Sequence, residues 1–224
     1  MKTETCNNAD DVASKCADII AREMLQAIDK RGQFTIAFSG GRSPLPLFRK
    51  LSELALPWDK VHVFQVDERI APDGDENRNF TSLKACLLDH VSIPSPQIHP
   101  IPVALIPLSQ AAQSYEALLI AHNGSPPQLD VIHLGMGEDG HTASLIPLDP
   151  ALDISDSYVA ISQDYNHFKR LTLTYGAINA ARCILWQITG KNKAPMLERL
   201  KSGDTSIPAG RVSRDQSIVV TDIQ

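Results

Sequence analysis

Residues 129–147, LDVIHLGMGEDGHTASLIP, carry the strongest structural signal in the chain. The first six form a short apolar run with β-branched side chains, which predicts a buried strand. Three glycines follow within six positions: Gly135, Gly137 and Gly140. Glycine permits backbone conformations that other residues avoid and lets backbone N–H groups approach a ligand. A strand that ends in such a loop before a helix forms a crevice at the carboxyl edge of an open α/β sheet, where ligands bind. We therefore expect the functional site here, beside Asp139 and His141.

Strand-like and helix-like segments alternate on both sides of this stretch. Apolar spacing and capping residues predict helices over residues 10–30, 44–54, 80–90, 109–122, 176–181 and 193–200. Further strands are predicted over residues 33–38, 61–66, 158–161, 171–174, 183–189 and 217–221, and residues 97–103 are expected to form a short extended segment between prolines. This alternation implies a three-layer α/β fold, in which a mainly parallel, Rossmann-like open sheet has helices on both faces. No repeat or linker divides the chain, so we expect one domain, residues 1–224.

Composition narrows the functional classes. The net charge of −5 argues against a nucleic-acid-binding surface, although it permits a local basic pocket. The four cysteines lie far apart without a CxxC pair, which is typical of reduced thiols in a cytoplasmic protein. The N-terminus is polar and acidic, unlike a signal peptide. No apolar run approaches the roughly 18 residues that span a membrane. We expect a cytoplasmic protein with no nucleic-acid or membrane partner.

The glycine loop matches G-x-G-x-x-G literally, so a dinucleotide site is one alternative. That fingerprint needs a long helix after the third glycine and an acidic residue about 20 positions later. Here Pro147 stops the helix within two turns, which argues against it. A second alternative is a turn that merely requires glycines. That alternative explains the glycines but not the adjacent Asp139 and His141.

A second loop, residues 39–44 (SGGRSP), joins a predicted strand to a helix whose N-cap we assign to Ser43. Unpaired N–H groups and the helix dipole favour a bound anion by about 0.3–2 kcal/mol. The Ser39 and Ser43 hydroxyls and the Arg42 cation would add contacts. The spacing is not that of a Walker loop. A tight turn with a helix cap explains the same residues.

Three further cations are candidates for the same crevice. Arg69 ends the run Asp67-Glu68-Arg69 after a strand, and its planar guanidinium suits phosphate or carboxylate. A local ion pair among these three residues is the alternative. Arg170 precedes a strand and Lys193 begins a helix; each could equally be a solvated charge.

Several catalytic classes lack their motifs. There is no H-E-x-x-H, and His62, His99, His133 and His141 do not have the spacing of metal ligands on one element, so we expect no metal. A G-x-S-x-G elbow is missing, and no cysteine lies in a candidate loop. Hydrolysis would therefore use water activated by a side-chain base. Histidine, with an ordinary pKa of about 6.5, suits that task, and His141 is the best placed. Asp139 would orient its ring.

Together these motifs resemble the 6-phosphogluconolactonases of the glucosamine-6-phosphate isomerase/6-phosphogluconolactonase family. The resembling segments occur in the family's order over about residues 34–195: residues 39–44, 66–69, 134–145 and 170–174, with Asn179. The run DGHTASL at 139–145 is the most specific. The chain departs from the family's pattern at Arg78, Ile146 and His167-Phe168.

The resemblance implies the fold of the NagB and CoA-transferase type and hydrolysis of 6-phosphoglucono-δ-lactone to 6-phosphogluconate in the oxidative pentose phosphate pathway, without metal or cofactor. It implies that His141 takes a proton from water, that Asp139 holds the ring, and that glycine-loop N–H groups stabilise the oxyanion. The substrate phosphate and sugar would contact residues of both loops and the neighbouring strands: Ser39, Gly40, Gly41, Arg42, Ser43, Asp67, Arg69, Asn79, Gly137, Arg170 and Lys193.

Two alternative functions remain open at this stage. A glucosamine-6-phosphate deaminase or isomerase shares the fold and the glycine-loop histidine. A non-catalytic sugar-phosphate sensor would keep the pocket without turnover, although Asp139 and His141 favour an enzyme. We expect a monomer or weak homodimer with a small sugar-phosphate lactone as its partner.

Overall fold

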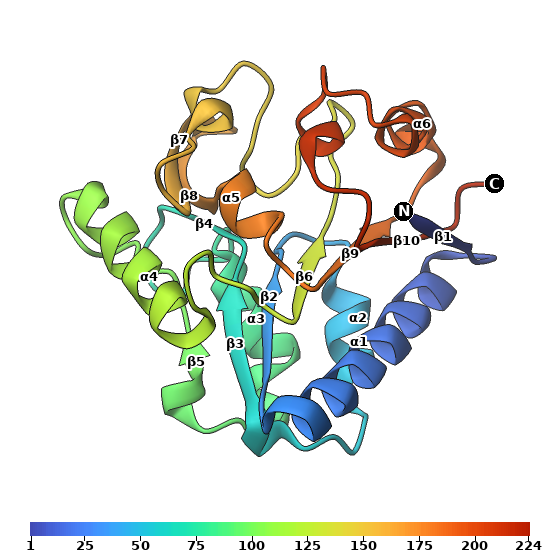
Figure 1. Cartoon of the computed structure of the whole chain (residues 1–224), viewed down its shortest axis with the longest axis horizontal. Coiled ribbons are helices and arrows are strands. Elements are labelled where there is room, and N and C mark those ends of the chain that lie inside the picture. Colours follow the sequence, from blue (N-terminus) through green and yellow to red (C-terminus); the bar gives the residue numbers. More distant parts are fainter.

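A seven-stranded parallel sheet forms the centre of the computed structural model, which describes residues 1–224 (Figure 1). In spatial order its strands are β1 (Lys2–Thr5), β10 (Ser217–Thr221), β9 (Cys183–Ile188), β6 (Val131–Leu134), β2 (Phe34–Phe38), β3 (Val61–Gln65) and β5 (Ile98–His99). The predicted strand of the glycine loop, β6, is thus the middle strand. The parallel sheet confirms the predicted fold class.

Helices cover both faces of this sheet, and Figure 1 shows α1 and α4 on opposite sides of the strands. The helices are α1 (Ala9–Arg31), α2 (Leu45–Ser52), α3 (Asn79–Cys86), α4 (Leu108–Asn123), α5 (Tyr175–Ile178) and α6 (Ala194–Ser202). Short 3₁₀ turns occupy Trp58–Lys60, Leu88–His90, Ser95–Gln97, Pro150–Asp153, Lys191–Lys193 and Pro208–Arg211. No helix has both the length and the apolar character needed to cross a membrane.

The side chains of the strands point alternately to the two faces of the sheet and contribute to an apolar core on each face. In β2, Phe34, Ile36 and Phe38 pack with α1, α2 and α3, whereas Ala37 belongs to the core beneath α4, α5 and α6. Because strand side chains alternate between faces, a sheet covered on both sides needs apolar residues at nearly every position. All five residues of β2 are buried accordingly.

A second, three-stranded antiparallel sheet was not predicted. Its order is β4 (Asp67–Arg69), β8 (Phe168–Leu173), β7 (Val159–Tyr165). We expected residues 67–69 in a loop and the other two segments in the parallel sheet. Instead the chain leaves the main sheet at Val66, whose carbonyl accepts a hydrogen bond from Leu173 N–H (2.8 Å). Figure 1 shows β4 beyond the tip of β3, so the small sheet stands over the carboxyl ends of the parallel strands.

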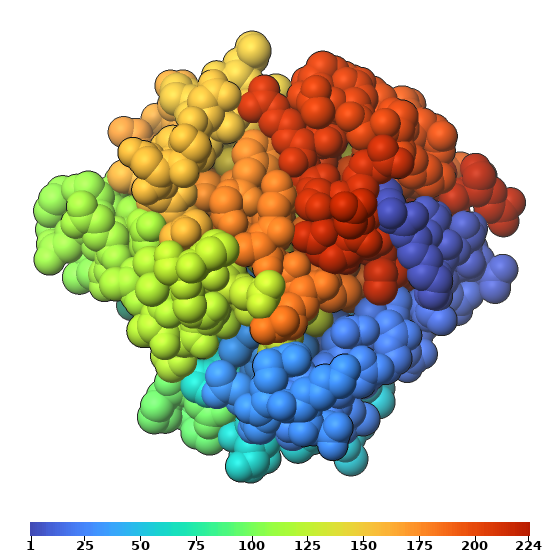
Figure 2. Space-filling model, viewed as in Figure 1, coloured from blue at the N-terminus to red at the C-terminus, as the bar shows by residue number.

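Two other local expectations were wrong, and one strand was not predicted. No helix follows Gly140; the chain makes tight turns there, with Ala143 in the left-handed region (φ 53°). The capping position of α2 is Pro44 rather than Ser43, and no side chain caps it. The polar segment Lys2–Thr5 is an edge strand, β1, because it pairs with β10. Figure 2 shows this N-terminal segment lying against the C-terminal part of the chain.

Candidate active site

A pocket of about 250 Å³ opens at the carboxyl ends of β2 and β6. From β2 the chain runs outward through β3 to β5, then returns to β6 on the other side of β2 and continues to β9 and β10. The strand order therefore reverses between β2 and β6, and loops that leave in opposite directions keep a crevice open at such a point. The residues after β2 and those after β6 face each other across this crevice.

Nearly all of the predicted site residues line this one pocket. They are Ser39, Gly40, Gly41, Arg42, Ser43, Asp67, Arg69, Asn79, Gly137, His141, Arg170 and Lys193. Asp139 is the one predicted residue that does not line it, because it lies against the ring of His141. The serine-glycine turn and the imidazole, about a hundred positions apart in the chain, thus share a pocket.

Asp139 holds the imidazole of His141. Its Oδ1 lies 2.6 Å from His141 Nδ1 and also accepts a hydrogen bond from the His141 backbone N–H (3.1 Å). The hydrogen bond from the imidazole lowers the pKa of Asp139 to about 2, so the carboxylate is charged at neutral pH. A carboxylate accepts the Nδ1 proton, which leaves the Nε2 lone pair of a neutral imidazole free. His141 is therefore arranged as a base.

Gly137 is required by this arrangement. A Cβ at this position would overlap the ring of His141 and the carboxylate of Asp139. The loop closes on itself as the Gly137 N–H donates to the His141 carbonyl (2.9 Å) and the Gly140 N–H donates to the Gly137 carbonyl (3.1 Å). The N–H groups of Gly137 and Gly140 are therefore bonded within the loop and are not free for an oxyanion. The absent helix after Gly140 also removes the dinucleotide alternative.

The turn after β2 approaches Asn79 closely. A Cβ on Gly40 would overlap the Asn79 side chain, and Gly41 adopts a left-handed conformation (φ 96°) that favours glycine. Asn79 Nδ2 donates to the Asp67 carbonyl (3.0 Å), which fixes the amide against the turn. The buried Ser39 hydroxyl has no partner in the protein although it lines the pocket. It is available to a ligand.

Glu68, which sequence reasoning did not single out as a site residue, holds this side of the pocket. Its fully buried carboxylate accepts the backbone N–H groups of Asn79 (2.7 Å) and Phe80 (2.8 Å) at the start of α3. A carboxylate at a helix N-terminus satisfies unpaired donors and the helix dipole. Glu68 pairs with the buried Arg78 (Nε to Oε2, 3.6 Å) rather than with the Arg69 guanidinium. The predicted alternative of an ion pair within residues 67–69 is therefore wrong.

Two arginines stand opposite each other in the small sheet. Arg69 of β4 and Arg170 of β8 are direct cross-strand partners, both line the pocket, and each has a buried Nε without a partner. Burial lowers the pKa of Arg170, and the neighbouring Arg69 charge lowers it further. Like charges placed directly opposite destabilise a sheet. A bound anion would relieve this repulsion and satisfy the free donors, so the pair has the charge and the donors to hold an anion.

Tyr165 connects the base to the arginine pair, and the sequence did not reveal it. Its hydroxyl donates to Asp139 Oδ2 (3.2 Å), and its ring lies edge-on to His141 with the ring centroids 5.4 Å apart. The guanidinium of Arg170 sits 5.2 Å from the Tyr165 ring centroid. A tight turn places the ring, since Asn166 and His167 both have positive φ between the paired residues Tyr165 and Phe168. The departure His167-Phe168 therefore lies at a hairpin turn beside the site, with Phe168 as the first residue of β8.

His133 and Gln187 also line the pocket without having been predicted as site residues. His133 Nε2 lies 3.0 Å from Gln187 Oε1, and Gln187 Nε2 donates to the Ser43 carbonyl (2.9 Å). Burial lowers the pKa of His133 to about 4, so this imidazole is neutral at neutral pH. The three residues tie β6 and β9 to the loop before α2.

Comparison with known proteins places this geometry in one family. The family model described as glucosamine-6-phosphate isomerases/6-phosphogluconolactonase matches residues 7–221. The chain therefore belongs to the glucosamine-6-phosphate isomerase/6-phosphogluconolactonase family.

Relatives in this family resemble the chain over most of its length. It is 38% identical to a 6-phosphogluconolactonase from Nostoc sp. over 192 residues, covering 84% of this chain and 79% of the relative. It is 40% identical to one from Synechocystis sp. over 178 residues, covering 78% and 74%. The crystal structure of a 6-phosphogluconolactonase from Thermotoga maritima superposes with a TM-score of 0.88 at 28% identity, covering 98% of each chain. A monomeric glucosamine-6-phosphate deaminase shares the fold at 19% identity with a TM-score of 0.84.

Proposed function

We propose that this protein hydrolyses 6-phosphoglucono-δ-lactone to 6-phosphogluconate in the oxidative pentose phosphate pathway. The observation that carries the proposal is the pocket in which a carboxylate-held imidazole and an opposed arginine pair meet. A δ-lactone phosphate needs a base at its carbonyl and cations for its phosphate. The names of the Nostoc, Synechocystis and Thermotoga relatives support the same reaction.

The reaction begins at His141. Its Nε2 takes a proton from water as the water oxygen attacks C1, and Asp139 stabilises the imidazolium that forms. The tetrahedral intermediate collapses with cleavage of the bond between C1 and the ring oxygen, and the imidazolium returns a proton to that oxygen. Among the donors left for the oxyanion is the unpaired Ser39 hydroxyl.

The substrate phosphate is assigned to the cations of the pocket. Arg69 and Arg170 supply planar guanidinium donors that match phosphate oxygens. Arg42 and Lys193 line the same pocket and add positive charge. Burial lowers the pKa of Lys193, so a phosphate close to it would stabilise its charged form.

A coupled assay on freshly prepared lactone, corrected for spontaneous ring opening, tests this function. The expected result is production of 6-phosphogluconate well above the uncatalysed rate. Release of ammonia from glucosamine 6-phosphate would instead assign the deaminase activity of the fold neighbour. Tight binding of 6-phosphogluconate without lactone hydrolysis would make the protein a sensor.

Tyr165→Phe tests the residue that links the two halves of the site. The variant keeps the ring but removes the hydrogen bond to Asp139. A hydrogen bond of this kind contributes about 1 kcal/mol, so we expect kcat to fall roughly fivefold with KM little changed. Tyr158→Phe, at a tyrosine outside the pocket, is the matched control. An unchanged kcat in Tyr165→Phe would show that Tyr165 does not position the dyad.

We also propose that the protein acts in the cytoplasm as a monomer or weak homodimer. Only five large hydrophobic side chains are exposed: Leu25, Leu105, Ile106, Leu148 and Ile161. An obligate homodimer buries a larger apolar surface. Light scattering during size-exclusion chromatography at micromolar concentration tests this, and a stable higher oligomer would contradict it.

A further inference from the structure

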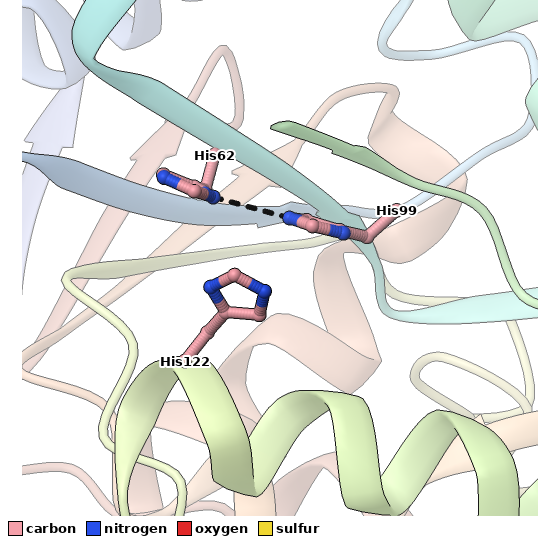
Figure 3. A group of neighbouring side chains, drawn as sticks. All are labelled: His62, His99 and His122. Atoms are coloured by element: carbon pink, nitrogen blue, oxygen red, sulfur yellow. Dashed lines mark hydrogen bonds between the residues drawn. The ribbon is translucent and has the colours of Figure 1, made fainter. Parts of the chain in front are cut away.

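Three of the seven histidines meet away from the active site (Figure 3). His62 belongs to β3, His99 to β5 and His122 to the last turn of α4. One ring nitrogen from each lies within 4.8 Å of the other two. Figure 3 shows His62 and His99 side by side, with His122 rising from its helix toward them. The cluster therefore joins two strands to the helix that covers them.

This histidine cluster, His62, His99 and His122, is separate from the active-site pocket, which none of the three lines. His62 is the second residue of β3 and lies three residues before the strand's carboxyl end at Gln65. At about 3.3 Å per residue the cluster sits roughly 10 Å from that end of the strand. An ion bound here would not contact a substrate held near His141.

Packing and one hydrogen bond explain part of the cluster. The His99 ring stacks on Phe64 with centroids 4.4 Å apart, as in an ordinary aromatic contact. The three imidazoles carry six ring nitrogens, yet they share one hydrogen bond, between His62 Nδ1 and His99 Nε2 (3.1 Å). Three imidazoles from different elements thus converge on one point. Converging imidazole nitrogens are a common donor set of a metal ion.

The protonation states and the spacing suit a transition metal. Burial, together with the His122 and His62 imidazoles, lowers the pKa of His99 to about 4, and burial also lowers the pKa of His62. Neutral imidazole is the form that binds metal. Zinc–nitrogen bonds of about 2.0–2.1 Å place tetrahedral ligand nitrogens roughly 3.3 Å apart, close to the spacing of His62 and His99. His122 must move inward to close the site.

His122 faces a solvent-filled hollow at the surface. This residue lines a surface hollow of about 130 Å³ together with Arg31, Asp130 and Arg182. The two arginines pair with Asp130 (2.7 and 3.4 Å), so their charge is partly neutralised. The hollow brings solvent to His122 and has room for a water molecule as a further ligand.

We propose that His62, His99 and His122 bind one divalent zinc-type ion, with water as the fourth ligand. The ion joins α4 to the β3–β5 edge of the sheet and stabilises the fold rather than the chemistry. Three imidazoles and no carboxylate favour zinc, cobalt, nickel or copper over magnesium or calcium.

The test is zinc binding by protein without an affinity tag, after dialysis against a chelator. Isothermal titration is expected to give one zinc ion per chain, and zinc at a hundredfold excess over Kd raises the unfolding temperature by roughly 5–10 °C. Cobalt in place of zinc gives the visible absorption bands of a tetrahedral site. His122→Ala removes the bands and weakens zinc binding at least about tenfold.

Matched variants separate this site from other histidines. His90→Ala, at an exposed histidine outside the cluster, and His141→Ala are both expected to bind zinc like the wild type. His62→Gln is the second test of the cluster, used if His122→Ala unfolds. No saturable binding, binding that survives both cluster variants, or binding that His141→Ala removes would each overturn the proposal.

Discussion

His141→Ala is expected to lower kcat for 6-phosphoglucono-δ-lactone at least about a hundredfold, because a positioned general base contributes 10²–10⁴-fold to such a reaction. KM should change little, since the imidazole acts on water rather than on the phosphate. The His141 side chain is 24% exposed, so truncation leaves no closed cavity and the protein stays folded. The measurement is the coupled assay, corrected for spontaneous opening, with the unfolding temperature checked in parallel.

Two variants make this experiment specific. Asp139→Asn keeps the size of the side chain but removes the charge that stabilises the imidazolium, so it should also lower kcat, by a smaller factor than the loss of His141. His90→Ala controls for the loss of an exposed histidine and should leave kcat unchanged. Turnover near the wild-type level in His141→Ala would mean that another group activates the water.

The meeting of Ser39 and His141 could be predicted from the sequence for a physical reason. In a parallel sheet all carboxyl ends lie on one edge, so loops that follow strands gather there whatever their distance along the chain. The strand signals before Ser39 and Gly135 were clear, and both segments proved to be neighbouring strands, β2 and β6. The loop conformation was less predictable, since the expected helix after Gly140 is replaced by turns.

The small antiparallel sheet could not be predicted, and it places the two arginines of the proposed anion site opposite each other. β4 has three residues, all polar, so it carries no apolar period that would mark a strand. Only pairing with β8 makes it one, and that register places Arg69 opposite Arg170. The role of Tyr165 depends on the same pairing and on the turn at Asn166 and His167. These relations exist only in three dimensions.

The histidine cluster, like the arginine pair, could not be predicted from the sequence. His62, His99 and His122 have no ligand spacing in the sequence, because metal motifs are recognised within one helix or loop. Here each residue comes from a different element, and nothing in the sequence marks His122 as a partner of the other two. Packing of α4 against β3 and β5 is what brings the three rings together.

Arg170→Ala is expected to raise KM about 10–100-fold with a smaller change in kcat, because charge-assisted hydrogen bonds to an anion contribute roughly 1.5–3 kcal/mol each. Arg170→Met separates charge from packing, since methionine replaces the aliphatic stem. If the arginine pair exists to hold an anion, neutralising one member relieves its repulsion with Arg69. The unliganded Arg170→Met protein should then unfold at a temperature no lower than the wild type.

Ligand-induced stabilisation is a second test of the proposed anion site. 6-Phosphogluconate should raise the unfolding temperature of the wild type but raise that of Arg170→Met much less, since the variant has lost a phosphate contact. Lys169→Ala, at the exposed neighbour, should behave like the wild type in both KM and stabilisation. An unchanged KM in Arg170→Ala would place the phosphate elsewhere in the pocket. A large loss of stability in unliganded Arg170→Met would instead make Arg170 a structural partner of Asp67 and Tyr165, whose charge the fold itself requires.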